Sequence, residues 1–118
     1  MRDHRKLDIF KSADVLVIRI YQVTKTFPKE ELYGLVSQMR RASVSVATNI
    51  VEGCGRRTET EFNRFLDIAF GSVRELGYLI DLSASLGYLD EDDTRQLGET
   101  YRQCAGELGV FIQKRESF

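Results

Sequence analysis

Residues 37–53 read SQMRRASVSVATNIVEG, and this run carries the strongest structural signal in the chain. Apolar side chains recur in it every three or four residues, which is the period of a helix that buries one face. At about 100° per residue, counted from Val46, other apolar side chains fall on the outer side of the same helix. One apolar face predicts packing into a bundle, and a second one predicts contact with another subunit.

Working outward from this run, the sequence predicts four helices, over about 8–26, 29–53, 59–86 and 91–115. Pro28 separates the first two helices, because proline suits a first helical turn and restricts the residue before it. Gly53 and Gly55 are expected to end the second helix. Thr58 with Glu61 forms a capping-box pattern for the third, and Asp90 is a candidate N-cap for the fourth.

Similar lengths and short connections predict an all-α protein, a single-domain antiparallel up-down four-helix bundle over residues 1–118. Each helix then has an inward stripe at steps of three and four. The predicted stripes are Phe10, Ala13, Val17, Ile20, Thr24 and Phe27; Leu32, Leu35, Met39, Ala42, Val46, Ile50 and Gly53; Phe62, Phe65, Leu66, Ala69, Val73, Leu76, Ile80 and Ser83; and Leu97, Tyr101, Cys104, Leu108, Phe111 and Arg115.

Composition is that of an ordinary globular protein. The chain has 118 residues, of which 42% are hydrophobic and 30% charged, so one core can form without disulfides or metal. Its two cysteines, Cys54 and Cys104, have no metal or redox spacing. The charged N-terminus is not followed by an apolar run. We therefore expect no signal peptide and no membrane span, and a cytoplasmic location.

Charge is unevenly distributed along the chain. Residues 1–64 contain 12 Lys/Arg and 8 Asp/Glu, a net +4, whereas residues 65–118 contain 5 and 10, a net −5. The total of −1 argues against a typical nucleic-acid binder. The asymmetry is compatible with a local basic surface on the first half, or with complementary charges between helices.

The outer side of the second helix is the candidate oligomer interface. Scattered apolar residues on a surface are normal, but a contiguous group marks an interface, and adjacent helices offer such a group. We expect homo-oligomerisation, the alternative being a monomer with isolated exposed apolar residues. The candidate interface residues are Tyr33, Arg40, Val44, Ala47 and Val51 from the second helix and Phe70 and Tyr78 from the third.

Polar residues on the flanks of the second and third helices have a structural interpretation. Asn49, Glu52, Ser72 and Glu75 can fix helix register or an interface through hydrogen bonds. Glu52 and Glu75 as an acid–base pair is the alternative, but no histidine lies near them to relay protons. The single histidine, His4, cannot build a di-metal site, and no phosphate-binding loop is present. We predict no catalytic residues, no metal and no cofactor.

Five arginines are candidate nucleic-acid ligands, because phosphate contacts need clustered positive charge. Repetition of each residue in a ring of subunits would turn a weak basic patch into a basic belt. The candidates are Arg40, Arg41, Arg56, Arg57 and Arg64.

Several segments together resemble a known bacterial family. They are Phe27-Pro28-Lys29-Glu30-Glu31, Ser37–Ala42, Ser45–Gly53 with its Asn-Ile-x-Glu-Gly motif, and Gly71–Leu76 with Gly-Ser-x-x-Glu. The chain is similar to the four-helix bundle proteins encoded in intervening sequences of 23S ribosomal RNA genes, the S23-like family. The resemblance implies a homopentameric barrel. It also implies a relation to accessory proteins of diversity-generating retroelements, which act with a reverse transcriptase and bind nucleic acid.

The sequence therefore predicts a non-enzymatic, homopentameric helical protein that acts as an accessory factor on structured RNA or DNA. Its expected partners are copies of itself, nucleic acid, and a reverse transcriptase or another protein, with no membrane. The alternative is a protein-interaction scaffold that binds no nucleic acid, with helix four as its acidic contact surface.

Overall fold

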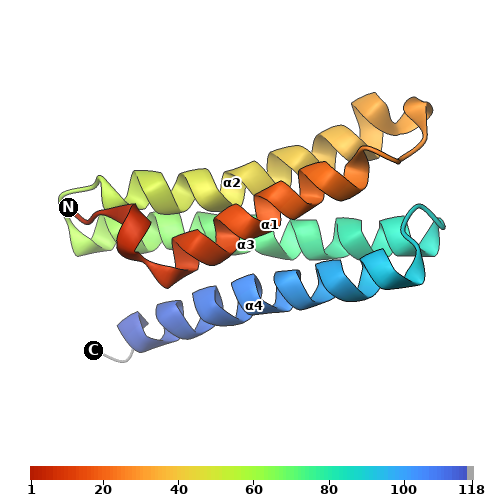
Figure 1. Cartoon of the computed structure of the whole chain (residues 1–118). Helices are drawn as coiled ribbons and strands as arrows, with labels where there is room; N and C mark the ends of the chain where they lie inside the picture. Colours follow the sequence, from red (N-terminus) through yellow and green to blue (C-terminus); the bar gives the residue numbers. More distant parts are fainter. Residues whose placement is uncertain (117–118) are drawn as a thin grey trace.

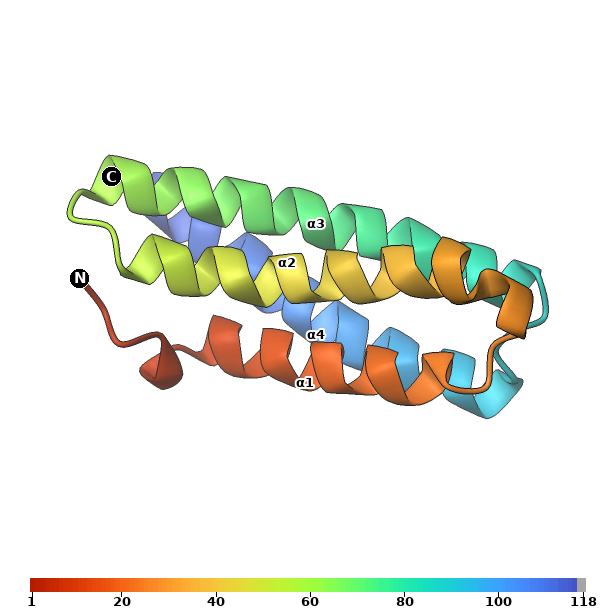
Figure 2. The ribbon, with the colours of Figure 1, turned by 90° about the horizontal axis from the view of Figure 1, so that it is seen from above.

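Four helices form the molecule, a computed structural model that describes residues 1–116 (Figures 1 and 2). They are α1 (Asp8–Thr24), α2 (Ser37–Cys54), α3 (Glu59–Ser85) and α4 (Glu91–Glu116). No strand occurs in residues 1–116. The predicted all-α four-helix fold is confirmed, and the first, third and fourth helices end within two residues of the expected positions.

The helices are packed in chain order around one core, so α1 lies beside α2 and α4, and α3 also lies beside α2 and α4. The N-terminus, the C-terminal end of α4 and the α2–α3 turn lie at one end of the bundle (Figure 1). The α1–α2 and α3–α4 connections lie at the other end of the molecule, whose long axis measures 44 Å. Neighbouring helices are consequently antiparallel, and the α1–α2 pair lies opposite the α3–α4 pair.

The second helix begins later than the sequence predicts. A 3₁₀ turn, η2 (Lys29–Glu31), and a π-type turn, η3 (Leu32–Val36), precede α2. Gly34 has non-helical backbone angles, φ −115° and ψ −109°. The Glu31 carboxylate accepts hydrogen bonds from the Leu35 N–H at 3.4 Å and the Tyr88 hydroxyl at 3.0 Å. The expected continuous helix over 29–53 is therefore wrong, and Leu32, expected inside, is 47% exposed.

The helix caps agree with the sequence signals. The Thr58 hydroxyl accepts the Glu61 N–H at 3.1 Å, and the Asp90 carboxylate accepts the Asp93 N–H at 2.7 Å. α3 ends in a Schellman motif, in which Gly87 has φ 80° and its N–H donates to the Ala84 carbonyl at 3.0 Å. Local hydrogen-bonding chemistry thus fixes where α3 and α4 begin and where α3 ends.

Burial confirms most of the predicted stripes and corrects the first. α1 buries Ile9 and Leu16 rather than Phe10 and Val17, which are half-buried. The buried pair and the predicted pair are both apolar, so hydrophobicity alone does not decide which side of α1 is buried. The packing of α1 between α2 and α4 decides it. On the other helices all stripe residues besides Leu32 are buried, except for four that are half-buried: Phe65, Tyr101, Phe111 and Arg115.

Of the two glycines expected to end the second helix, Gly55 is the C-cap of α2, whereas Gly53 lies inside the helix, which continues to Cys54. A Cβ at this position would lie 3.0 Å from the Phe65 Cβ and 3.2 Å from Phe62 Cδ1. The missing side chain therefore lets α2 and α3 approach closely.

Gly53→Ala should lower the free energy of unfolding by about 1–3 kcal/mol, because the added methyl group overpacks the contact with Phe65. The matched variant Gly71→Ala should raise it by up to about 1 kcal/mol, because alanine favours a helix. Gly71 is exposed, and a methyl group added there would meet no atom within 4 Å. Urea denaturation followed by circular dichroism measures both, and equal stabilisation by the two changes would contradict the close approach.

Within residues 1–116, none of the helices combines the length and apolar character needed to cross a membrane.

Candidate functional site

Arg40, a candidate for both the oligomer interface and nucleic-acid binding, is bound to α1 of its own chain. Its Nε donates a hydrogen bond to the Thr24 hydroxyl at 3.0 Å, and Nη2 reaches the Tyr21 carbonyl at 3.5 Å. The guanidinium carbon lies 4.6 Å from the centroid of the Tyr21 ring. A cation in this place also interacts favourably with the negative C-terminal end of the α1 dipole. Arg40 therefore stabilises the α1–α2 contact.

This contact locates an apolar surface along α1 and α2. Continuing down α2 from Arg40 at steps of three and four leads to Val44, Ala47 and Val51, all half-buried. Because α1 runs antiparallel to α2, the α1 residues beside Val44, Ala47 and Val51 come before Tyr21 in the sequence. There Ile18 is 51% exposed and Tyr21 is 40% exposed. We call this surface the α1–α2 face: Val17, Ile18, Tyr21, Val44, Ala47 and Val51.

The two candidate interface residues of α3 do not join this surface. A ring carbon of Phe70 lies 3.6 Å from the position of a Cβ on Gly109 of α4. Tyr78, 65% exposed, lines a hollow with Gly98 and Arg102 of α4. The expected patch across α2 and α3 is wrong, because the outer face of α2 turns toward α1 while Phe70 and Tyr78 turn toward α4. Tyr33 lies on η3 rather than α2 and is 93% exposed.

Polar side chains join α2 to α3 at mid-length. The Ser45 and Ser72 hydroxyls lie 2.8 Å apart. The Asn49 amide donates to the Ser45 carbonyl at 2.8 Å and to its hydroxyl at 3.1 Å. Glu52 and Glu75 are exposed and form no hydrogen bond or ion pair with residues 1–116. Asn49 and Ser72 thus hold helix register, whereas the two carboxylates are left on the surface.

The five candidate arginines do not form one patch. Arg40 and Arg41 lie near the start of α2, about 20 Å along the helix from its end at Cys54. Arg56 and Arg57 are exposed in the α2–α3 turn, and Arg56 lies over the Phe65 ring at 4.7 Å. Arg64 is exposed farther along α3. Only Arg56, Arg57 and Arg64 share one end of the bundle.

A cluster at that same end was not predicted. Arg2 donates to both oxygens of Glu59, at 2.7 and 2.9 Å, and its guanidinium carbon lies 4.0 Å from the centroid of the Phe62 ring. Arg115 also pairs with Glu59, and its guanidinium carbon is 4.6 Å from the same centroid. The Arg2 N–H donates to the Cys54 carbonyl at 2.8 Å. The N-terminal segment is thereby fastened to the ends of α2, α3 and α4, and we call this cluster the end clamp.

One sequence signal pointed to the end clamp, namely an arginine in the inward stripe of helix four. Burial lowers the pKa of Arg115, and the nearby Arg2 charge lowers it further. The carboxylate of Glu59 offsets this cost by pairing with both guanidinium groups. The second partner, Arg2, lies 57 residues from Glu59 in sequence, and no local pattern indicates such a contact.

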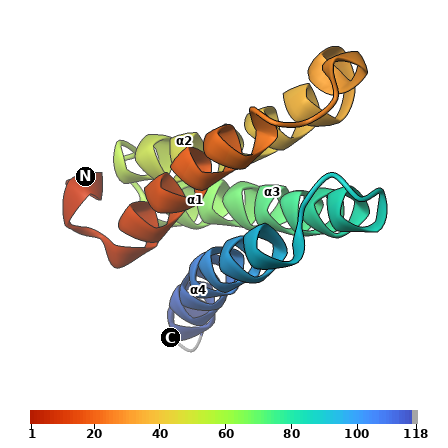
Figure 3. The ribbon, with the colours of Figure 1, turned by 45° about the vertical axis from the view of Figure 1, so that its right-hand side comes forward.

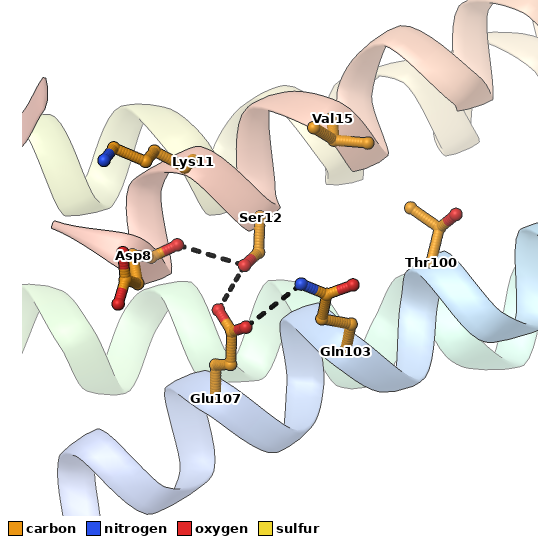
Figure 4. Close-up of a pocket in the computed structure, with 7 residues that line it drawn as sticks. All are labelled: Asp8, Lys11, Ser12, Val15, Thr100, Gln103 and Glu107. Carbon is orange, nitrogen blue, oxygen red and sulfur yellow. Dashed lines mark hydrogen bonds between the residues drawn. The ribbon is translucent and has the colours of Figure 1, made fainter.

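A small hollow of about 250 Å³ lies between α1 and α4 (Figure 4). In it the Ser12 hydroxyl contacts the Glu107 carboxylate and lies 3.0 Å from the Asp8 carbonyl. The Gln103 amide donates to Glu107 at 3.1 Å. No imidazole lines the hollow, and His4 packs instead against the edge of Phe10, with 4.7 Å between ring centroids. These bonds join α1 to α4.

Metal ligands do not converge in the part of the chain that the structure describes: no three His, Cys, Asp or Glu side chains there are placed to hold an ion. Cys54 and Cys104 are both buried free thiols. Burial raises the pKa of Cys104 from its ordinary 9.0 to about 12, with a smaller contribution in the same direction from the Glu107 charge. Cys104 therefore stays protonated and unreactive in the folded protein at neutral pH.

This pKa predicts a loss of stability in alkali. Between pH 9.0 and 12 the unfolded chain loses the Cys104 proton while the folded chain keeps it, so the free energy of unfolding falls as pH rises. From pH 9 to 10 the expected loss is about 1 kcal/mol. Urea denaturation at both pH values measures it, and Cys104→Ala should remove that part of the slope. An unchanged slope in the variant would contradict the assignment.

Four antiparallel helices around one apolar core define a small all-α protein of the helix-bundle class. The chain matches the family described as 23S rRNA-intervening sequence protein over residues 5–109, and it belongs to that family. Its structure is similar to one solved from Bacteroides thetaiotaomicron VPI-5482, titled a protein with unknown function from the S23 ribosomal protein family. The TM-score is 0.81 at 18% identity, with 88% of this chain and 97% of that chain covered. No curated protein matches the chain.

Proposed function

We propose that the chain is a non-enzymatic subunit that assembles with copies of itself into a ring and acts as an accessory factor on structured RNA. The observation that carries this proposal is the α1–α2 face, six apolar residues on two adjacent helices, of which Ile18 and Tyr21 are exposed and the other four are half-buried. Contiguous apolar surfaces of this kind are typical of protein–protein interfaces. Five subunits per ring is what the family resemblance implies.

The basic end of the bundle supports an RNA contact. Arg56 and Arg57 are exposed in the α2–α3 turn, and neither forms an ion pair within residues 1–116. Arg5 is exposed in the N-terminal segment, which is fastened to this end. In a ring these charges repeat once per subunit, so a near-neutral chain can present a belt of positive charge. The family description, which refers to 23S rRNA intervening sequences, also favours RNA.

RNA binding should depend on these arginines and on salt. For Arg56→Glu/Arg57→Glu we expect at least tenfold weaker binding of a structured ribosomal RNA fragment, because phosphate contacts are replaced by repulsion. The control variant Lys29→Glu reverses an exposed charge in η2, at the opposite end of the bundle, and should bind almost normally. Arg40 is avoided because its substitution would break the contact with Tyr21 and Thr24. Fluorescence anisotropy over a salt series measures all three proteins.

The alternative is a protein-interaction scaffold. Two observations favour it: the candidate arginines are divided between two regions, and Asp90, Glu91 and Asp92 form an exposed acidic start to α4. The same titration separates the two functions. Binding that weakens steeply as salt rises supports the RNA contact, whereas no binding even at low salt would leave the scaffold.

A further inference from the structure

A second apolar surface lies on the side of the molecule opposite the α1–α2 face. A hollow of about 500 Å³ opens between the N-terminal half of α3 and the C-terminal half of α4. Phe70, Ala105 and Ile112 line it with apolar atoms, and Gly106 has no atom within 4 Å of its Cβ position. Figures 1 and 3 show α4 diverging from α3 toward its C-terminal end, where the hollow lies.

The other flank of α4 is also hollowed. A depression of about 570 Å³ there is lined by Leu7, Ile9, Phe111 and, from the ridge between the two hollows, Val110. Val110 is itself 50% exposed. The C-terminal half of α4 is thus an apolar ridge between two hollows, a shape that can receive a ridged helical surface. We call the surface the α3–α4 face: Phe70, Ala105, Gly106, Gly109, Val110 and Ile112.

Charge distinguishes the two sides of the molecule. Residues 1–57, which form α1, α2 and their connections, contain 11 Lys/Arg and 6 Asp/Glu, a net +5. Residues 58–118 contain 6 and 12, a net −6. Among the described residues, the charged side chains that line the α3–α4 hollow are Asp67 and Glu116, both acidic. The depression on the other flank of α4 has no net charge, because its lining includes Lys6 and Lys114 as well as Asp8 and Glu107. Exposed Lys25 and Arg41 flank the α1–α2 face. Two α1–α2 faces brought together would place like charges opposite each other, which is unfavourable.

We propose that the α1–α2 face of one copy docks on the α3–α4 face of the next, so that the subunits associate head to tail. The pairing sets a basic side against an acidic one and covers both apolar surfaces. A symmetric dimer through the α1–α2 faces would leave the α3–α4 hollow empty. A head-to-tail contact repeats from subunit to subunit and closes into a ring when the rotation permits. The inference rests on the proposed self-assembly and specifies which surfaces meet.

Complementation between two variants tests the pairing. Gly106→Leu fills the hollow from a position with open space around it, and leucine favours a helix more than glycine does, so this variant should fold. Val44→Asp places a charge in the α1–α2 face and leaves the α3–α4 face intact. Each variant alone should sediment as a monomer of 13.5 kDa. An equimolar mixture should form a 1:1 dimer of twice that mass, because one intact face of each kind remains.

Matched controls are Gly106→Ala, which adds one methyl group to the hollow, and Val44→Thr, which is nearly isosteric. Both should stay assembled like the unchanged protein. Two results would overturn the pairing while leaving self-assembly intact: Gly106→Leu that remains fully assembled, or a mixture that stays monomeric. An unchanged protein that is itself monomeric would refute the proposed assembly and the pairing with it. Raising the salt concentration should weaken association, because salt screens the attraction between the basic and the acidic side. If two basic faces met instead, salt would screen their repulsion and association would become stronger.

Discussion

Phe62→Ala is expected to lower the free energy of unfolding by about 3–5 kcal/mol, the range for removing a buried phenylalanine ring. Phe62 is 0% exposed and lies beneath the guanidinium groups of Arg2 and Arg115. It also meets the edge of Phe111, with 6.2 Å between ring centroids. The change removes the apolar platform of the end clamp as well as core volume. Such a loss is a large fraction of the roughly 5–15 kcal/mol that stabilises a domain.

The measurement is urea denaturation monitored by circular dichroism. Phe62→Leu, which keeps most of the volume, should cost less than half as much as Phe62→Ala. Tyr33→Ala, at a side chain that is 93% exposed, serves as a surface control and should be nearly neutral in the monomer. A loss below about 1 kcal/mol for Phe62→Ala would show that the ring does not hold this end together.

Val44→Asp is expected to dissociate the assembly while the helical content stays near that of the unchanged protein. Val44 is half-buried by its own chain, so the carboxylate keeps access to water in the monomer. In the assembly it would be buried without a partner, which typically costs several kcal/mol. Sedimentation velocity measures dissociation, and circular dichroism measures helix content.

Ile68→Asp is the matched control for this variant. Ile68 is an apolar residue of α3 that is 43% exposed and lies outside the α1–α2 and α3–α4 faces. It should leave the assembly intact. If Ile68→Asp dissociates the protein as strongly as Val44→Asp, the interface is not where we place it.

Sequence signals that act within one or two helical turns predicted the structure well. Thr58 and Asp90 carry hydroxyl or carboxylate groups at N-cap positions, and both caps form as expected. The stripes of α2 and α3 were predictable, even though α2 carries a second apolar group at Val44, Ala47 and Val51. The start of α2 was not, because Glu31 turns back on the Leu35 N–H and Gly34 departs from helical geometry.

Features that depend on packing between helices were less predictable. Leu16 and Val17 are adjacent and both apolar, so only the neighbours of α1 decide which is buried. The second apolar group of α2 was recognised, but its turning toward α1 follows from contacts such as Arg40 with Tyr21. The pairing of Arg2 and Arg115 through Glu59 joins residues 57 and 56 positions apart, beyond the reach of any local pattern.

The mass of the unchanged protein in solution tests self-assembly most directly. Light scattering coupled to size-exclusion chromatography, over a range of protein concentrations, should give an integral multiple of 13.5 kDa, five in the ring we propose. A constant 13.5 kDa particle at every concentration would mean that Val44, Ala47 and Val51 face water in the functional protein. Neither the ring nor the belt of arginines could then exist.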